Sequence, residues 1–591
     1  MFKIFKLLPT TTRFRILLCA LISIMPSFFE MFIPQFVKQF IVMSDRTQEI
    51  TVVKLFHWQI LPPQGLTVYQ FLIILVIGCS LANLVLWIIS LRLSEYTISH
   101  IRHLIRMQLF KKIINLSKDN INELSHASII TYFGNDINKI NGGFFVLCRS
   151  LLNGTFLIVW GLVFSLNLDL NLSIAIFINI PVVIIGSLFA IKFLFPSFRK
   201  ENWILDKLNE KAKQDINGIE LIKTYNLENY RYKLYNEENE NLLKLNLKVT
   251  KTSSIAWPVI HTFVAFGNIL VFLIFGFLAK NYTNANIQEK VGNLYQFLAY
   301  LGLISSGIFQ VCFESNKLFR ARFSAKRIYE VLQMESIIPE VTNDNKPTEW
   351  NIEFKNVSYR YKNNETQNAL QNVSFKIPNS SSVGIIGTTG SGKSTIVNLL
   401  TKEILPTQGE ILINNLNLNE IDSAHLRQNI SAIWQKNMLL SGSIKENLVF
   451  THENANDAEI DEVINIAQAN FIKDYPDKYE QIIGQHGINL SGGQKQRISI
   501  AQGLIKKPNV LILDDSTSAL DNKTDKNLQD QIKSKLKDTT LIIISQRIRT
   551  IQNLDQIIVL DQGQIVGNGS HQELLANNTY YQKLFESQKE K

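Results

Sequence analysis

Nine consecutive residues have the types and spacing that bind phosphate groups. The segment 387–395 reads GTTGSGKST and matches the pattern GxxxxGK followed by Ser or Thr at every fixed position. Its members are Gly387, Thr388, Thr389, Gly390, Ser391, Gly392, Lys393, Ser394 and Thr395. Glycines let main-chain N–H groups close around phosphate oxygens at a helix N-terminus, Lys393 reaches the outer phosphates, and the Ser394 hydroxyl can hold Mg²⁺. We therefore predict that this loop binds a nucleoside triphosphate; a glycine-rich turn without a ligand is the alternative.

The segments around this loop read as the elements that must position it. The apolar run 383–386 indicates a buried strand, and 396–400 indicates the helix that follows, so the loop lies between strand and helix. Another apolar run, 510–513, ends in two aspartates. A carboxylate at the end of a buried strand beside a phosphate loop holds Mg²⁺, and Asp514 fits that role. Tyr361 is placed to stack on an adenine ring, although it could equally be an ordinary strand aromatic.

The first half of the chain reads as a membrane domain. Of the 591 residues 46% are hydrophobic, and they crowd the first half. Six stretches approach the roughly 20 apolar residues needed to cross a bilayer: about 16–42, 68–91, 145–166, 170–194, 255–279 and 291–313. Four are interrupted by polar residues or breakers, among them Glu30, Arg149, Asn179 with Pro181, and Asn268. Such interruptions suit helices that pack on one another around a pathway.

The distribution of basic residues predicts the orientation. Lys and Arg are frequent in 92–141 and 192–254 and sparse in 43–66, so the two long loops are expected to face the cytoplasm. An even number of spans then places both termini and the phosphate loop in the cytoplasm, where ATP is found, and makes this a multi-pass protein of the cell membrane. These loops explain much of the net charge of +10, and no basic stripe is interleaved with aromatics, so no nucleic-acid partner is expected.

The long cytoplasmic loops have helical periodicity of their own. Apolar residues recur at helical spacing through 98–114 and again through 203–247, which predicts helices that continue beyond the bilayer. Their turning points, 116–140 and 214–230, are either ordinary hairpin ends or tips that dock on the ATP-binding half and carry force. Glu30 is either a helix-packing hydrogen bonder or a contact for a cationic substrate. Arg149 can snorkel to the inner interface and is given no role.

The segment LSGGQ, at 490–494, carries the most specific signal. Together with the phosphate loop, Asp514, the SALD segment at 518–521 and the six spans, it makes the whole chain resemble an ABC exporter half-transporter. The resemblance implies a multidomain fold: an all-α six-helix transmembrane domain (1–319), a linker (320–349) and an α/β P-loop nucleotide-binding domain (350–591). ATP and Mg²⁺ are the implied cofactors.

The resemblance also implies roles for residues outside the phosphate loop. Ser491, Gly492, Gly493 and Gln494 would close over the γ-phosphate of ATP bound to the other subunit. Gln435 matches the glutamine that senses Mg²⁺ and the membrane domain, and it is expected to be both a metal ligand and a catalytic residue. Asp521 closes the loop after the catalytic strand, and the two cytoplasmic tips match the coupling helices.

Three positions depart from the family's pattern. Where the family has its catalytic glutamate this chain has Asp515, whose carboxylate reaches about 1.5 Å less far toward the attacking water. Where the family has its switch histidine stands Gln546, which cannot take a proton or carry a charge. Gln485 replaces a glutamate that would pair with the coupling helices. Asp515 and Gln546 remain the expected catalytic positions, in a site that should bind ATP well and hydrolyse it slowly.

This combination resembles the degenerate member of heterodimeric ABC exporters. The expected partner is a second, different half-transporter, with a homodimer as the alternative. We expect ATP-driven export of an amphipathic or apolar substrate, such as a drug, a lipid or a peptide-like molecule, through a twelve-span dimer surrounded by membrane lipid. The alternative function is an ATP-gated channel or a regulatory, non-transporting subunit. The six spans exclude a soluble ABC ATPase of the DNA-repair or translation type.

Overall fold

The computed structural model describes residues 1–43, 52–55, 58–279, 287–338, 340–361 and 368–589. They form two compact units. The first comprises Met1–Ile114 with Ser125–Met334, and the second comprises Asn115–Leu124 with Glu335–Lys591. Each unit has hydrophobic clusters of its own.

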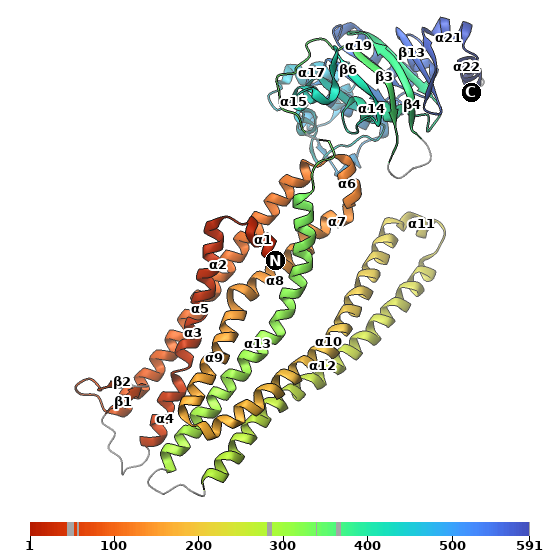
Figure 1. Cartoon of the computed structure of the whole chain (residues 1–591). Coiled ribbons are helices and arrows are strands. Elements are labelled where there is room, and N and C mark those ends of the chain that lie inside the picture. Colours follow the sequence, from red (N-terminus) through yellow and green to blue (C-terminus); the bar gives the residue numbers. More distant parts are fainter. Residues whose placement is uncertain (44–51, 56–57, 280–286, 339, 362–367, 590–591) are drawn as a thin grey trace. The chain divides into compact units, whose positions relative to one another are not determined.

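The first unit is helical apart from one short hairpin, β1 (Val53–Leu55) with β2 (Trp58–Ile60) (Figure 1). Its helices are α1 (Phe2–Leu7), α2 (Thr10–Ile22), α3 (Met25–Glu30), α4 (Ile33–Met43), α5 (Val68–Ile114), α7 (His126–Thr131), α8 (Ile137–Phe145), α9 (Leu151–Leu168), α10 (Leu170–Asn217), α11 (Ile219–Thr224), α12 (Glu228–Ala279) and α13 (Ile287–Gln333), with π-helical turns at η1 (Tyr132–Asp136) and η2 (Val146–Ser150). Within the described residues six segments are long and apolar enough to cross a membrane: Thr10–Met43, Val68–Ile114, Ser128–Leu168, Leu170–Leu188, Thr262–Ala279 and Ile287–Gln333. The prediction of six transmembrane segments is confirmed.

The first of these segments differs from the continuous helix expected over 16–42. It is divided into α2, α3 and α4, because Pro26 stands in the first turn of α3 and Pro34 in the first turn of α4. Proline suits a first turn, where its missing N–H would have no helical partner, and it costs a hydrogen bond in a helix interior. Glu30 is the last residue of α3, at one of these breaks, and its side chain is half-buried.

The helices predicted through 98–114 and 203–247 are present as parts of long continuous helices. Helix α5 has 47 residues and α10 has 48, while α12 has 52. At 1.5 Å per residue such helices are about 70 Å long, more than twice the roughly 30 Å hydrocarbon thickness of a bilayer. The short helix α11 joins α10 to α12 at the second predicted tip.

Small residues set the spacing between packed helices in this unit. A Cβ on Gly154 of α9 would meet the Gly307 carbonyl oxygen of α13 at 3.0 Å, and a Cβ on Gly161 would meet Ile304 at 2.6 Å. Between α10 and α12 the Asn179 side chain donates a hydrogen bond to the Phe263 carbonyl at 3.2 Å. Glycine contacts and interhelical amide bonds replace the hydrophobic driving force, which is absent between helices in lipid. The polar interruption at Asn179 is therefore a packing contact.

The second unit is built on a mostly parallel sheet with helices, which agrees with the α/β fold that the resemblance implied. The order of its six strands is β14-β13-β5-β12-β11-β8, and only β14 runs antiparallel to its neighbour. These strands are β5 (Ser382–Gly387), β8 (Ile430–Ile433), β11 (Val510–Asp514), β12 (Thr540–Ile544), β13 (Gln556–Asp561) and β14 (Gln564–Gly569). Strands β5, β11 and β12 are buried along their whole length, which explains their continuous apolar sequences.

A second sheet in this unit was not predicted from the sequence. It is antiparallel, in the order β4-β3-β6-β7, and consists of β3 (Ile352–Tyr359), β4 (Leu370–Ile377), β6 (Gln408–Ile413) and β7 (Leu416–Asn417). The short pair β9 (Gly442–Ser443) and β10 (Ile482–Ile483) completes the strands. The helices of the unit include α6 (Lys118–Leu124), α14 (Lys393–Leu400), α15 (Ser423–Asn429), α16 (Ile444–Val449), α17 (Asp457–Ile466), α18 (Gly492–Leu504), α19 (Asn522–Lys535), α20 (Ile548–Ile551), α21 (His571–Asn577) and α22 (Thr579–Lys589).

Candidate nucleotide site

Four adjacent strands of the parallel sheet bring the candidate residues together. The phosphate loop follows β5, and β12, β11 and β8 lie next to it in that order. Ile385 of β5 pairs with Ile544 of β12, which in turn pairs with Asp514 of β11. The carboxyl ends of parallel strands meet at one edge of a sheet, which is where such folds bind ligands. Residues far apart in the sequence therefore converge at this edge.

The phosphate loop has the conformation that its glycines permit. Gly392, with a φ of +101°, is the N-cap of α14, and a Cβ there would meet the Ala369 carbonyl oxygen at 2.6 Å. Lys393 donates from Nζ to the carbonyls of Gly387 (2.9 Å) and Thr388 (2.7 Å). The Ser391 hydroxyl is buried and has no hydrogen-bond partner among the described residues. A helix N-terminus, an ammonium group and an unpaired hydroxyl in one loop fit a polyphosphate.

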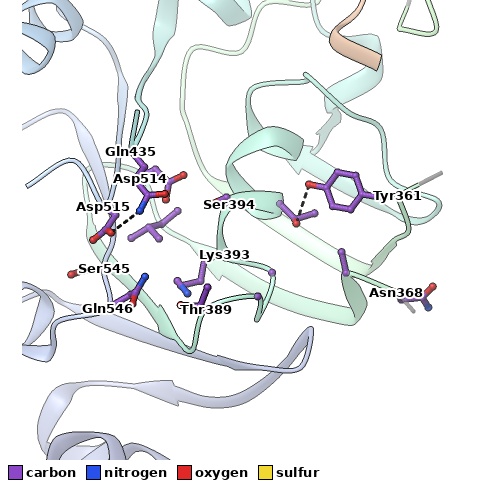
Figure 2. Close-up of a pocket in the computed structure, with 15 residues that line it drawn as sticks. Tyr361, Asn368, Thr389, Lys393, Ser394, Gln435, Asp514, Asp515, Ser545 and Gln546 are labelled. Carbon is purple, nitrogen blue, oxygen red and sulfur yellow. Dashed lines mark hydrogen bonds between the residues drawn. The ribbon is translucent and has the colours of Figure 1, made fainter. Parts of the chain in front are cut away.

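A cavity of about 400 Å³ opens beside this loop. Its lining consists of Tyr361, Asn368, Ala369, Thr389, Gly390, Gly392, Lys393, Ser394, Thr395, Gln435, Asp514, Asp515, Ile544, Ser545 and Gln546. Figure 2 shows Tyr361 at one end and Asp515 with Gln546 at the other, with Lys393 between them. The Tyr361 hydroxyl lies 3.3 Å from Oγ1 of Thr395, and its ring is partly exposed.

Residues that follow three neighbouring strands line the cavity at its Gln546 end. Gln435 donates from Nε2 to Oδ2 of Asp515 at 3.2 Å. Asp515 has a left-handed backbone conformation, with a φ of +48°, and its N–H donates to the Ile544 carbonyl at 2.9 Å. The exposed side chain of Gln546 belongs to residues 545–547, called the switch loop below. Asp515 and Gln546, two of the three positions that depart from the family's pattern, line this same cavity, whereas Gln485 does not.

Burial shifts the pKa values of the charged groups that line the cavity. Burial raises the pKa of Asp514, and a hydrogen bond with Ser394 opposes that rise. Burial also raises the pKa of Asp515, opposed by the hydrogen bond from Gln435. The pKa of Lys393 is lowered, again mainly by burial. A bound cation beside the two aspartates would favour their charged forms.

Some predicted residues do not line this cavity. Gly387, Thr388 and Ser391 form the loop but are not part of the lining. Ser491 is the N-cap of α18 and forms a capping box with Gln494, so Gly492 and Gly493 occupy the first turn of that helix. Asp521 is the N-cap of α19 and accepts a hydrogen bond from the Thr524 N–H at 3.1 Å. The LSGGQ segment is thus a helix N-terminus outside this chain's own cavity.

The first predicted tip, 116–140, is divided between the units: its residues up to Leu124 belong to the second unit, and those from Ser125 belong to the first. Lys118 of α6 forms an ion pair with Glu403 at 2.6 Å and lies over the Trp434 ring at 5.1 Å, next to Gln435. The buried Asn120 accepts a hydrogen bond from the Ile337 N–H (3.0 Å) and donates to the Glu335 carbonyl (3.3 Å). Helix α6, the first part of this tip, therefore packs within the unit that contains the ATP-binding half, while the transmission of force stays a prediction. Helix α11, the second tip, belongs to the first unit.

Sequence reasoning missed several residues of this site. Asn368 and Ala369 line the cavity just before β4, and Ile544 with Ser545 does so at the end of β12. Ser545 directly precedes Gln546, and this position next to a predicted site residue is a local signal for Ser545. Asn368 carries no local signal, because the approach of the antiparallel sheet to the cavity is a tertiary contact.

Comparisons with known proteins agree with this arrangement. The model of the ABC transporter transmembrane region matches residues 14–308, and the ABC transporter model matches residues 370–518. The ABC transporter ATP-binding protein MG014 of Mycoplasma genitalium is 32% identical over 535 residues, which cover 87% of this chain and 85% of that protein. YheI of Bacillus subtilis, named as a probable multidrug resistance ABC transporter ATP-binding/permease protein, is 33% identical and covers 79% of this chain and 77% of its own.

A solved structure has the same fold over nearly the whole chain. A bacterial Atm1-family ABC exporter with ATP bound superposes with a TM-score of 0.81, at 21% identity and with 98% of each chain covered. The chain belongs to the ABC transporter family and has the organisation of an exporter half-transporter, with one membrane region and one ATPase domain. It is a multi-pass membrane protein.

Proposed function

We propose that this chain is the degenerate half of a heterodimeric ABC exporter: its own site binds ATP and hydrolyses it slowly, while a partner chain supplies the competent site. The observation that carries the proposal is that Asp515 and Gln546 both line a cavity whose phosphate loop is intact. A shortened carboxylate and an amide that cannot take a proton weaken the orientation of water and γ-phosphate, but not the grip on ATP.

The residues of the cavity suit a division of labour along the nucleotide. Tyr361 would stack on the adenine, and Lys393 would contact the outer phosphates. Ser394, Asp514 and Gln435 would hold Mg²⁺, which supplies charge neutralisation on the phosphates when it is bound. The N-terminus of α18, with Ser491 and Gly492, would close over ATP in the partner's site.

The transport role follows from the membrane half. We propose outward movement of an amphipathic or apolar substrate, with both termini and the ATPase domain in the cytoplasm. Support comes from YheI, whose name refers to multidrug resistance, and from the basic loops of the membrane half. An ATP-gated channel would not carry a substrate uphill, so uphill, vanadate-sensitive transport in vesicles separates these two functions.

The test is purification of the chain alone and with candidate partner half-transporters that carry an intact glutamate and histidine. We expect weak ATPase activity from the chain alone and a rise by at least about 10²-fold in the heterodimer, because each geometric defect in a catalytic unit can cost that much. A homodimer with vigorous ATPase activity would refute the proposal. A partner with its catalytic Glu changed to Gln is the control that assigns the activity to one site.

A further inference from the structure

The last helix of the chain brackets the switch loop. Gln588 of α22 donates from Nε2 to the Gln546 carbonyl at 2.8 Å, and its Oε1 accepts from the Ile548 N–H at 2.9 Å. The two bonds hold the main chain on both sides of Arg547. Arg547 itself donates to the Ser518 carbonyl at 3.2 Å, so the switch loop also contacts the segment that follows β11. One side chain thus contacts the main chain of the switch loop at both Gln546 and Ile548.

The same helix also contacts the strand beside the phosphate loop. The Tyr580 hydroxyl donates to Oδ1 of Asp561 at 3.0 Å, and Asp561 directly follows Leu560, which pairs with Gly387. Tyr581 is fully buried in the hydrophobic core, and its hydroxyl lies 2.7 Å from Nδ1 of His571. The core thus anchors α22 at Tyr581, and the contacts of Tyr580 and Gln588 come from the same helix.

We infer that α22 is a positioning element of the nucleotide site and that Gln588 is the positioning residue that holds Gln546 toward the outermost phosphate. The inference rests on the proposed function, because it takes the cavity to bind ATP. A nucleotide whose base lies at Tyr361 directs its last phosphate toward Asp515 and Gln546, at the other end of the cavity (Figure 2). ADP lacks that phosphate, so the bracket should matter for ATP and not for ADP.

The experiment uses the full-length chain in lipid nanodiscs and compares Gln588→Ala with Gln582→Ala. Gln582 is a matched control, because it lies on the same helix and donates to the Leu575 carbonyl at 2.6 Å, within the C-terminal segment. With Gln588→Ala we expect the Kd for ATP to rise about five- to tenfold and the Kd for ADP to stay unchanged, as for one lost hydrogen bond of ordinary strength. Gln582→Ala should change neither constant.

Amide hydrogen exchange gives a second readout that needs no nucleotide. The Ile548 amide should exchange faster in Gln588→Ala and at the normal rate in Gln588→Glu, which keeps an acceptor oxygen but loses the donor to Gln546. Faster exchange with an unchanged ratio of ATP to ADP affinity would overturn the positioning role, as would equal weakening of both nucleotides. The two failures are distinguishable. Vigorous ATPase activity of the unmodified homodimer would refute the proposed function, whereas an unchanged ratio of ATP to ADP affinity in Gln588→Ala would refute only the positioning role.

Discussion

Gln435 and Asp515 share a hydrogen bond of 3.2 Å although they lie 80 positions apart. Gln435 follows β8 and Asp515 follows β11, and these two strands are neighbours in the sheet. The contact joins the residue expected to sense Mg²⁺ and the membrane domain to the carboxylate expected to orient water. It also opposes the rise in the pKa of Asp515 that burial causes.

Restoring hydrolysis at this chain's own site should require two substitutions. We expect Asp515→Glu to raise single-turnover hydrolysis less than about tenfold, and Asp515→Glu with Gln546→His to raise it by about 10²-fold or more, because residues of one catalytic unit do not act additively. The measurement is release of labelled phosphate in the heterodimer, with the partner's catalytic Glu changed to Gln. Adding Lys393→Ala to the double variant is the control and should remove the gain. Rapid release from the unmodified site would contradict the prediction.

The first turn of α18 should matter for the partner's site. Gly492→Asp places a carboxylate where γ-phosphate contacts are expected, and we predict a loss of about 10²-fold or more in heterodimer ATPase activity. Gly492→Ala is the steric control, because its Cβ would meet Ala519 at an ordinary 3.8 Å. Near-normal activity of Gly492→Asp would show that this helix terminus does not serve the competent site.

The buried carboxyl of Asp514 gives a pH dependence whose sign is determined by its raised pKa. Its folded-state pKa lies above the ordinary value of 3.8, so folding favours the protonated form. This stabilising contribution is present below pH 3.8 and is lost as the pH rises through the raised pKa. At neutral pH we therefore expect Asp514→Asn to raise the Tm of the nucleotide-free chain and to weaken Mg²⁺-dependent ATP binding. The measurement is thermal unfolding from pH 4 to 8; a lower Tm at pH 7 would contradict the burial argument.

Two side chains of α6, Asn120 and Lys118, should contribute unequally to the stability of the second unit. Asn120→Ala leaves the Ile337 N–H and the Glu335 carbonyl without their partner, which should cost about 1–3 kcal/mol because the site is buried. Lys118→Ala removes a partly exposed ion pair and should cost only about 0.2–1 kcal/mol. Hydrogen exchange at Ile337 checks the contrast. Equal protection in both variants would mean that Asn120 does not hold the linker.

Several parts of this protein could be predicted from the sequence because their determinants are local. The phosphate loop needs only nine consecutive residues, and the transmembrane segments need only length and hydropathy. The strand ending at Asp514 is a continuous apolar run, and LSGGQ gave the family. The breaks in the first span are local too, because Pro26 and Pro34 begin new helices, yet hydropathy alone does not mark them.

Only the tertiary structure decided which of these residues share a site. Strand order places Gln435, Asp515 and Gln546 on one cavity, and no local pattern determines the order of strands in a sheet. The tertiary structure also groups α6 with the ATP-binding half, through the contact between Asn120 and Ile337, which are 217 positions apart. The two hydrogen bonds of Gln588 to the switch loop are likewise contacts between separate elements. Such contacts depend on how whole elements bury their apolar faces, which is decided by the complete chain.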